Sequence, residues 1–68
     1  MSKPYSKLRG RITEKYGTIK DFAGAFGVSA PAMNRMLTTE YTWNMKAIEK
    51  ARVLLDITPD EVGTIFLP

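Results

Sequence analysis

The side chains with which this sequence could do chemistry are mainly cationic, and most of them lie in its first half. Residues 1–36 contain seven lysines and arginines against two acidic residues, a formal charge of +5, whereas residues 37–68 contain three against five, a charge of −2. A basic half is expected of a protein that turns one side to a phosphate backbone, although an ordinary solvated helix face also carries lysines. By itself the charge pattern leaves both interpretations open.

Catalytic and metal chemistry is not expected, because the sequence contains no cysteine and no histidine. Their absence removes the commonest general base, the commonest metal ligands and any disulfide framework. No apolar run approaches the length that crosses a membrane, and the N-terminal residues lack the apolar core of a signal peptide. We therefore expect a cytoplasmic protein that is not an enzyme and has no cofactor, no metal and no membrane partner.

The stretch from Thr18 to Leu37 is predicted to position the central functional side chains on two short helices. Thr18 and Ser29 are good N-caps, Pro31 is tolerated in a first helical turn, and Gly27 can take the positive φ that ends one helix and redirects the chain. The inward faces of the two helices are then formed by Ile19, Phe22, Ala23, Phe26, Met33, Met36 and Leu37.

The same apolar spacing predicts helices in the rest of the chain, so that residues 1–68 form one small all-α domain. Thr58, Pro59 and Glu61 give a clear helix start with a capping box, and Thr42 or Asn44 is expected to cap the helix before it. The five helices are expected at about residues 5–16, 19–26, 30–37, 44–56 and 59–66.

The central motif resembles the helix-turn-helix of the phage Cro and repressor (XRE-like) family of DNA-binding proteins. The resemblance rests on Phe22-Ala23, on Gly27-Val28-Ser29 after three intervening residues, and on the apolar Met33 and Met36. The alternative is an ordinary small helical protein, in which an amphipathic helix, a glycine and a second helix are also common. YSKLRGRITEKYGT and LLDITPDEVGTIF look more specifically like short Cro-like or repressor-modulating regulators of temperate phages of Gram-positive bacteria. The resemblance implies a five-helix lambda-repressor-like fold acting in the bacterial host.

If the resemblance holds, the second helix of the motif enters the major groove of operator DNA. It would present four residues to the bases, Ala30, Pro31, Asn34 and Arg35. Arg35 could pair with guanine, and Asn34 could read adenine or bind phosphate, whereas Ala30 and Pro31 offer only apolar contact with a thymine methyl. This reading surface is sparse, so specificity would also depend on DNA shape.

The resemblance also implies contacts with the phosphate backbone from residues around the motif. The family often has glutamine where Ile19 stands, and this glutamine bridges phosphate and the recognition helix, so that Lys20 would supply a simpler charge contact. The expected phosphate-binding residues are Lys3, Lys7, Arg9, Lys20, Ser29, Thr39, Tyr41, Thr42 and Asn44. Trp43, in the same loop, is either a further contact or a lid on the core over Met36 or Ile48, and the lid is the interpretation we favour.

Two functions remain open from the sequence. The first is a dimeric, sequence-specific regulator of a lysis-lysogeny switch that binds double-stranded operator DNA. The second is an antirepressor-like modulator that keeps the repressor fold but binds a partner repressor in a heteromeric complex, with weak DNA binding of its own. In either case the apolar C-terminal segment needs a cover, and we expect Phe66 and Leu67 to face a neighbouring subunit or partner.

Overall fold

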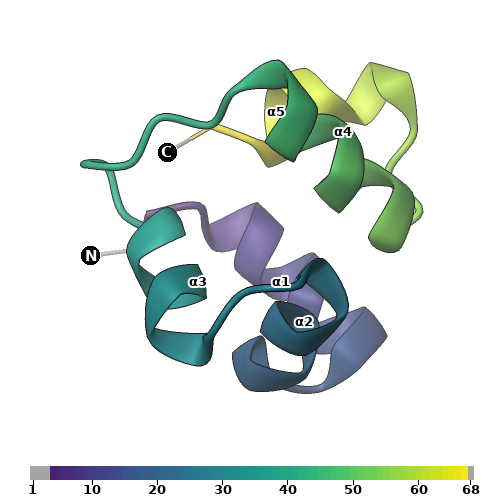
Figure 1. Cartoon of the computed structure of the whole chain (residues 1–68). Helices are drawn as coiled ribbons and strands as arrows, with labels where there is room; N and C mark the ends of the chain where they lie inside the picture. Colours follow the sequence, from purple (N-terminus) through teal and green to yellow (C-terminus); the bar gives the residue numbers. More distant parts are fainter. Residues whose placement is uncertain (1–3, 68) are drawn as a thin grey trace.

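The chain folds into helices that pack in two layers, as expected for an all-α protein. In the computed structural model, which describes residues 4–67, five α-helices and one 3₁₀ turn (η1) follow each other without any strand. The helices α1 to α3 form one layer, and α4 and α5 lie together over it (Figure 1). The elements are α1 (Ser6–Tyr16), α2 (Ile19–Phe26), α3 (Ala30–Met36), α4 (Met45–Leu54), η1 (Pro59–Glu61) and α5 (Val62–Ile65).

Three of the helices begin at polar side chains that accept a hydrogen bond from the backbone of the first turn. The hydroxyl of Thr18 accepts from the Asp21 N–H at 3.1 Å, and that of Ser29 accepts from the Ala32 N–H at 3.2 Å. Asn44, one of the two predicted caps of α4, accepts from the Ala47 N–H at 2.7 Å. Each cap satisfies a backbone donor that the helix itself leaves unpaired, and thereby fixes where the helix starts.

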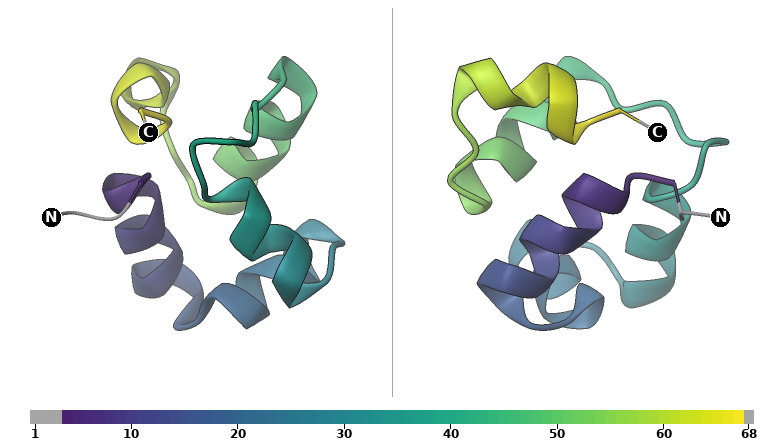
Figure 2. Two further views of the ribbon diagram at one scale, coloured as in Figure 1. Left: turned by 90° about the vertical axis from the view of Figure 1, so that its left-hand side faces the viewer. Right: turned by 180° about the vertical axis from the view of Figure 1, so that it is seen from behind.

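The turn between α2 and α3 depends on Gly27, which has a φ of 97°. The N–H groups of Gly27 and Val28 both donate to the carbonyl of Ala23, at 2.9 and 3.0 Å. This arrangement closes α2 and sends the chain into α3 after only two more residues, so that the two helices cross at a steep angle (Figure 2). The predicted helix, turn and second helix are therefore present.

The helix α4 ends at Leu54, two residues before the predicted end, because Asp56 adopts a φ of 54°. The N–H of Ile57 then donates to the carbonyl of Arg52 at 3.0 Å and stops the helix. Asp tolerates this left-handed conformation better than most residues, so no glycine marks the position. The last predicted helix is also divided, because its first residues form η1 and only Val62–Ile65 is α-helical.

The core lies between the two layers and includes side chains from α1, α2, α3 and the segment after α4. Its largest fully buried side chains are Leu8, Ile12, Phe22, Met33, Leu37 and Ile57. No helix of residues 4–67 has both the length and the apolar character needed to span a bilayer.

Trp43 covers the edge of this core, which is the lid interpretation of the sequence. Its indole N–H donates to the carbonyl of Met36 at 2.8 Å. Its ring meets Phe66 at 5.2 Å and Tyr41 at 5.7 Å between centroids, both in T-shaped geometry. The indole therefore contacts the end of α3, the following loop and the C-terminal segment. These contacts agree with a packing role for Trp43 as a lid on the core.

Two ion pairs connect α1 to the C-terminal part of the chain. Arg11 pairs with Glu61, and Lys15 pairs with Asp56. A hydrogen bond from the Thr58 N–H lowers the pKa of Glu61, and Arg11 adds to this effect. A hydrogen bond from Lys15 lowers the pKa of Asp56. The carboxylate forms are therefore favoured by folding.

Replacing Gly27 with alanine is expected to destabilise the fold by about 1–2 kcal/mol, because its φ of 97° is costly for any residue with a Cβ. The matched control is Gly24→Ala in α2, the helix that Gly27 ends, where an added Cβ meets nothing within 4 Å and φ is helical. This control should stabilise the protein by about 0.5–1 kcal/mol. Urea denaturation of both variants tests the turn, and destabilisation of equal size in both would contradict it.

The stability of the protein should fall in acid as the carboxylates of Glu61 and Asp56, which pair with Arg11 and Lys15, take up protons. Because folding lowers both pKa values, their contribution is complete above the ordinary values of 4.5 for Glu61 and 3.8 for Asp56 and is lost as pH falls below them. Glu61→Gln and Asp56→Asn should each flatten this acid limb in urea denaturation at several pH values. Glu14→Gln, an exposed residue of α1 outside these ion pairs, serves as the control. Identical acid limbs in all four proteins would show that the ion pairs contribute nothing.

Candidate functional site

The outer surface of α3 exposes the residues that were predicted to contact DNA bases. Pro31, Asn34 and Arg35 are exposed and Ala30 is half-buried, and we call these four residues the α3 face. The structure thus brings the predicted base-reading residues together on one helix. The only charged group among them is the guanidinium of Arg35, which forms no salt bridge with any residue in the described range 4–67.

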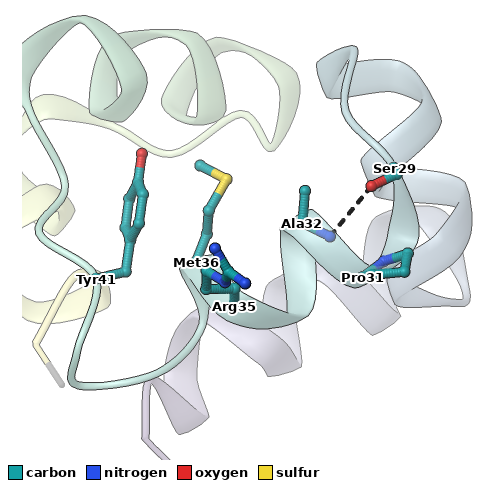
Figure 3. A pocket seen from close by; sticks show the side chains of 6 residues that line it. All are labelled: Ser29, Pro31, Ala32, Arg35, Met36 and Tyr41. Atoms are coloured by element: carbon teal, nitrogen blue, oxygen red, sulfur yellow. Dashed lines mark hydrogen bonds between the residues drawn. The ribbon is translucent and has the colours of Figure 1, made fainter.

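A groove of about 420 Å³ lies beside the α3 face (Figure 3). We call it the α3 groove. Along it, Met36 and Ala32 lie between Tyr41, from the loop after α3, and Pro31 at the start of the helix. The hydroxyl of Ser29 is already engaged by the Ala32 N–H. The lining is mostly apolar, and its residues are Ser29, Pro31, Ala32, Arg35, Met36 and Tyr41.

Arg9, one of the predicted phosphate-binding residues, points into the fold. Its Nε donates to the carbonyl of Pro4 at 2.9 Å, and one terminal nitrogen donates to the carbonyl of Leu37 at 2.9 Å. A guanidinium at the end of a helix also interacts favourably with the partial negative charge there. Arg9 therefore ties the start of α1 to the end of α3, and these hydrogen bonds use two of the five N–H donors of its guanidinium.

The other predicted phosphate-binding residues are distributed over several elements. Ser29 and Asn44 use their side chains as helix caps, and Tyr41 is half-buried in the α3 groove. Lys3 lies outside the described residues. The remaining four residues are exposed to solvent, and they are Lys7 on α1, Lys20 on α2, and Thr39 and Thr42 in the loop after α3.

The two residues predicted to face a subunit or partner differ in exposure. Leu67 is 62% exposed. Phe66 is half-buried, because its ring packs on the indole of Trp43. An intramolecular partner thus already covers part of the apolar surface that the sequence left open.

Ala32 was not predicted as a site residue, and Met36 was assigned to the core alone. Met36 is only 6% exposed, yet it lines the α3 groove. Ala32 and Met36 are four residues apart and so share one side of α3. That spacing, followed by an aromatic residue in the next loop, is the signal in the sequence that could have indicated the groove.

The whole chain matches a known family. The family is described as "Protein of unknown function (DUF739)", and its match covers residues 1–68. The chain belongs to this family. Among solved structures, the chain is similar to the modulator of repression (MOR) of the temperate bacteriophage TP901-1 from Lactococcus lactis, solved in solution. The two are 39% identical with a TM-score of 0.83, and the match covers 97% of this chain and 89% of that one.

These comparisons support a phage regulatory protein and agree with the small all-helical fold. A search among curated proteins finds no significant match. The regulatory class predicted from the sequence is therefore supported at this coarser level.

Arg9→Ala is expected to destabilise the fold by about 1–3 kcal/mol, because the carbonyls of Pro4 and Leu37 lose their charged donor. Lys7→Ala, which removes an exposed cation from the same helix, should change stability by less than about 0.5 kcal/mol. Thermal or urea denaturation measures both. Equal stability of the Arg9→Ala variant and the wild type would show that Arg9 does not hold α3.

Proposed function

We propose that this chain modulates a phage repressor by binding the repressor protein directly, in the cytoplasm of the bacterial host. The similarity to the modulator of repression of phage TP901-1 supports this proposal, because it extends over 97% of the chain at 39% identity. At this level of similarity we expect the two proteins to share a general role. We do not expect their partner repressors to have the same sequence.

The observation that carries the proposal is the chemistry of the α3 face. Direct readout of DNA requires side chains that hydrogen-bond to base edges, and only Asn34 and Arg35 can do so here. Ala30 and Pro31 carry no side-chain donor or acceptor. The adjoining α3 groove is mostly apolar, which suits the side chains of a protein better than a polyanionic backbone.

Operator binding of the Cro type is the second candidate, and the helix, turn and helix of α2 and α3 favour it. The positive charge of residues 1–36 also agrees with a DNA partner. In that case the protein acts as a homodimer on two half-sites about 34 Å apart, one turn of the duplex. Against it, the Arg9 guanidinium is held by the carbonyls of Pro4 and Leu37, which restricts its freedom to reach a phosphate.

The proposal is tested with the purified repressor of the phage that encodes this chain and with the intergenic DNA upstream of the chain's own gene. We expect a stable complex with the repressor in the absence of DNA, measured by calorimetry and sedimentation. Binding to the DNA alone should be weak, should fall steeply with salt, and should show no preference over a scrambled sequence of equal length.

The decisive control for the second candidate is Arg35→Ala. Sequence-specific DNA binding by the wild type without repressor, lost in this variant, would contradict the proposal and support operator readout by the α3 face. Absence of a complex with the repressor would also contradict it.

A further inference from the structure

The α3 groove is lined by side chains that the fold holds in place. Its floor includes Met36, which belongs to the core, and its walls are Pro31 on one side and the ring of Tyr41 on the other (Figure 3). The floor is held in place, because the carbonyl of Met36 accepts the indole N–H of Trp43. The wall is held as well, because Tyr41 packs on Trp43 at 5.7 Å between ring centroids.

The size and lining of the groove suit an apolar side chain. A volume of about 420 Å³ exceeds that of one large side chain, and the groove is open to solvent along α3. An apolar group that enters the groove would be transferred from water to a surface formed by carbon and sulfur atoms of Pro31, Ala32 and Met36. Anchors of this kind commonly supply much of the affinity of a protein interface.

The edge of the groove carries a positive charge that the fold does not neutralise. Arg35 lines the groove, is exposed, and pairs with no carboxylate among residues 4–67. Glu40, in the following loop, is exposed and does not pair with it. The guanidinium is therefore available for a bidentate contact with an acidic group, in a place where an apolar neighbour would exclude water.

We propose that the α3 groove binds an apolar side chain of the phage repressor, and that a carboxylate next to that side chain pairs with Arg35. This inference rests on the proposed function and specifies the chemistry of its partner. The apolar anchor supplies affinity, and the acidic residue determines which repressor is accepted, because a partner without it leaves Arg35 desolvated and unpaired.

The α4 helix of a second copy of this chain is a poorer occupant. The exposed large apolar residues on α4 are Met45 and Val53. The carboxylates nearest to them along the chain, Glu49 and Asp56, already pair with Arg52 and Lys15. An α4 helix from another copy would thus bring an apolar side chain but no unpaired carboxylate of its own.

Two substitutions test the two halves of the proposal. Ala32→Gln fills the groove without breaking the helix, since glutamine is a good helix former. Arg35→Ala removes the charge from an exposed position, where we expect a change in stability of less than about 0.5 kcal/mol. Calorimetry with the purified repressor should show that each variant binds about tenfold more weakly than wild type or worse, a loss of about 1.4 kcal/mol.

The matched control for charge is Lys20→Ala, which removes a cation from α2 outside the groove lining. It should bind the repressor within about twofold of wild type. Circular dichroism and urea denaturation of all variants establish that each is folded before its affinity is compared.

A double-mutant cycle identifies the carboxylate. Each surface Asp and Glu of the repressor is changed in turn to Asn or Gln and titrated with wild type and with Arg35→Ala. Substitution of one acidic residue should weaken the binding of the repressor to the wild-type protein about tenfold. The same substitution should hardly change its binding to Arg35→Ala, because the partner of the carboxylate is already absent there.

The outcomes separate this inference from the proposed function. If the wild type binds the repressor tightly and both Ala32→Gln and Arg35→Ala bind it equally well, the groove is not the binding site, and this inference is wrong. The proposed modulator function is then unaffected. Absence of coupling at every repressor carboxylate overturns the role of Arg35. Failure of the wild type to bind the repressor overturns the proposed function and this inference together. A homodimer that these variants dissociate, or specific DNA binding that they abolish, assigns the groove to a second copy or to DNA and also overturns it.

Discussion

The hydrogen bonds at the end of α3 are the constraint on which the rest of the structure depends. A helix of seven residues has little stability of its own, and its last carbonyls have no partners within the helix. Two distant side chains supply them, since Trp43 donates to Met36 and Arg9 donates to Leu37. These contacts set the position of α3, and they place the loop that carries Tyr41 beside it. The end of this helix and the loop that carries Tyr41 both contribute residues to the α3 groove.

This constraint bears on our proposal that the exposed surface of α3 meets a protein and not DNA. Arg9, which could have served phosphate binding, is used to hold α3. The exposed part of α3 retains a single cation, Arg35, next to an apolar groove. Such a surface has few groups for base edges but combines an apolar anchor site with one specific charge, a pattern typical of protein interfaces.

The sequence predicts the parts of the fold that depend on local interactions. Thr18 and Ser29 act as caps within three residues of their donors, and Gly27 is needed for a positive φ, so a pattern of residue types is sufficient. The end of α4 was not predicted, because Asp56 adopts a positive φ without a glycine to mark it. The role of Arg9 could not be predicted either, since its acceptor at Leu37 is 28 residues away and only the packed fold brings them together. For the groove, the spacing of Ala32 and Met36 is a local signal, but Tyr41 comes from a loop without periodicity, so the sequence alone does not place its ring beside them.

The central claim is that the α3 face and its groove are the surface that meets the partner. It is tested most directly by titrating the isotope-labelled protein with the unlabelled purified repressor and following backbone amide signals by NMR. The account predicts that the largest shifts and line broadening fall on residues 29–41, with smaller effects at Trp43. Changes that instead gather on the exposed residues of α4, around Met45 and Val53, with residues 29–41 unaffected, would contradict it.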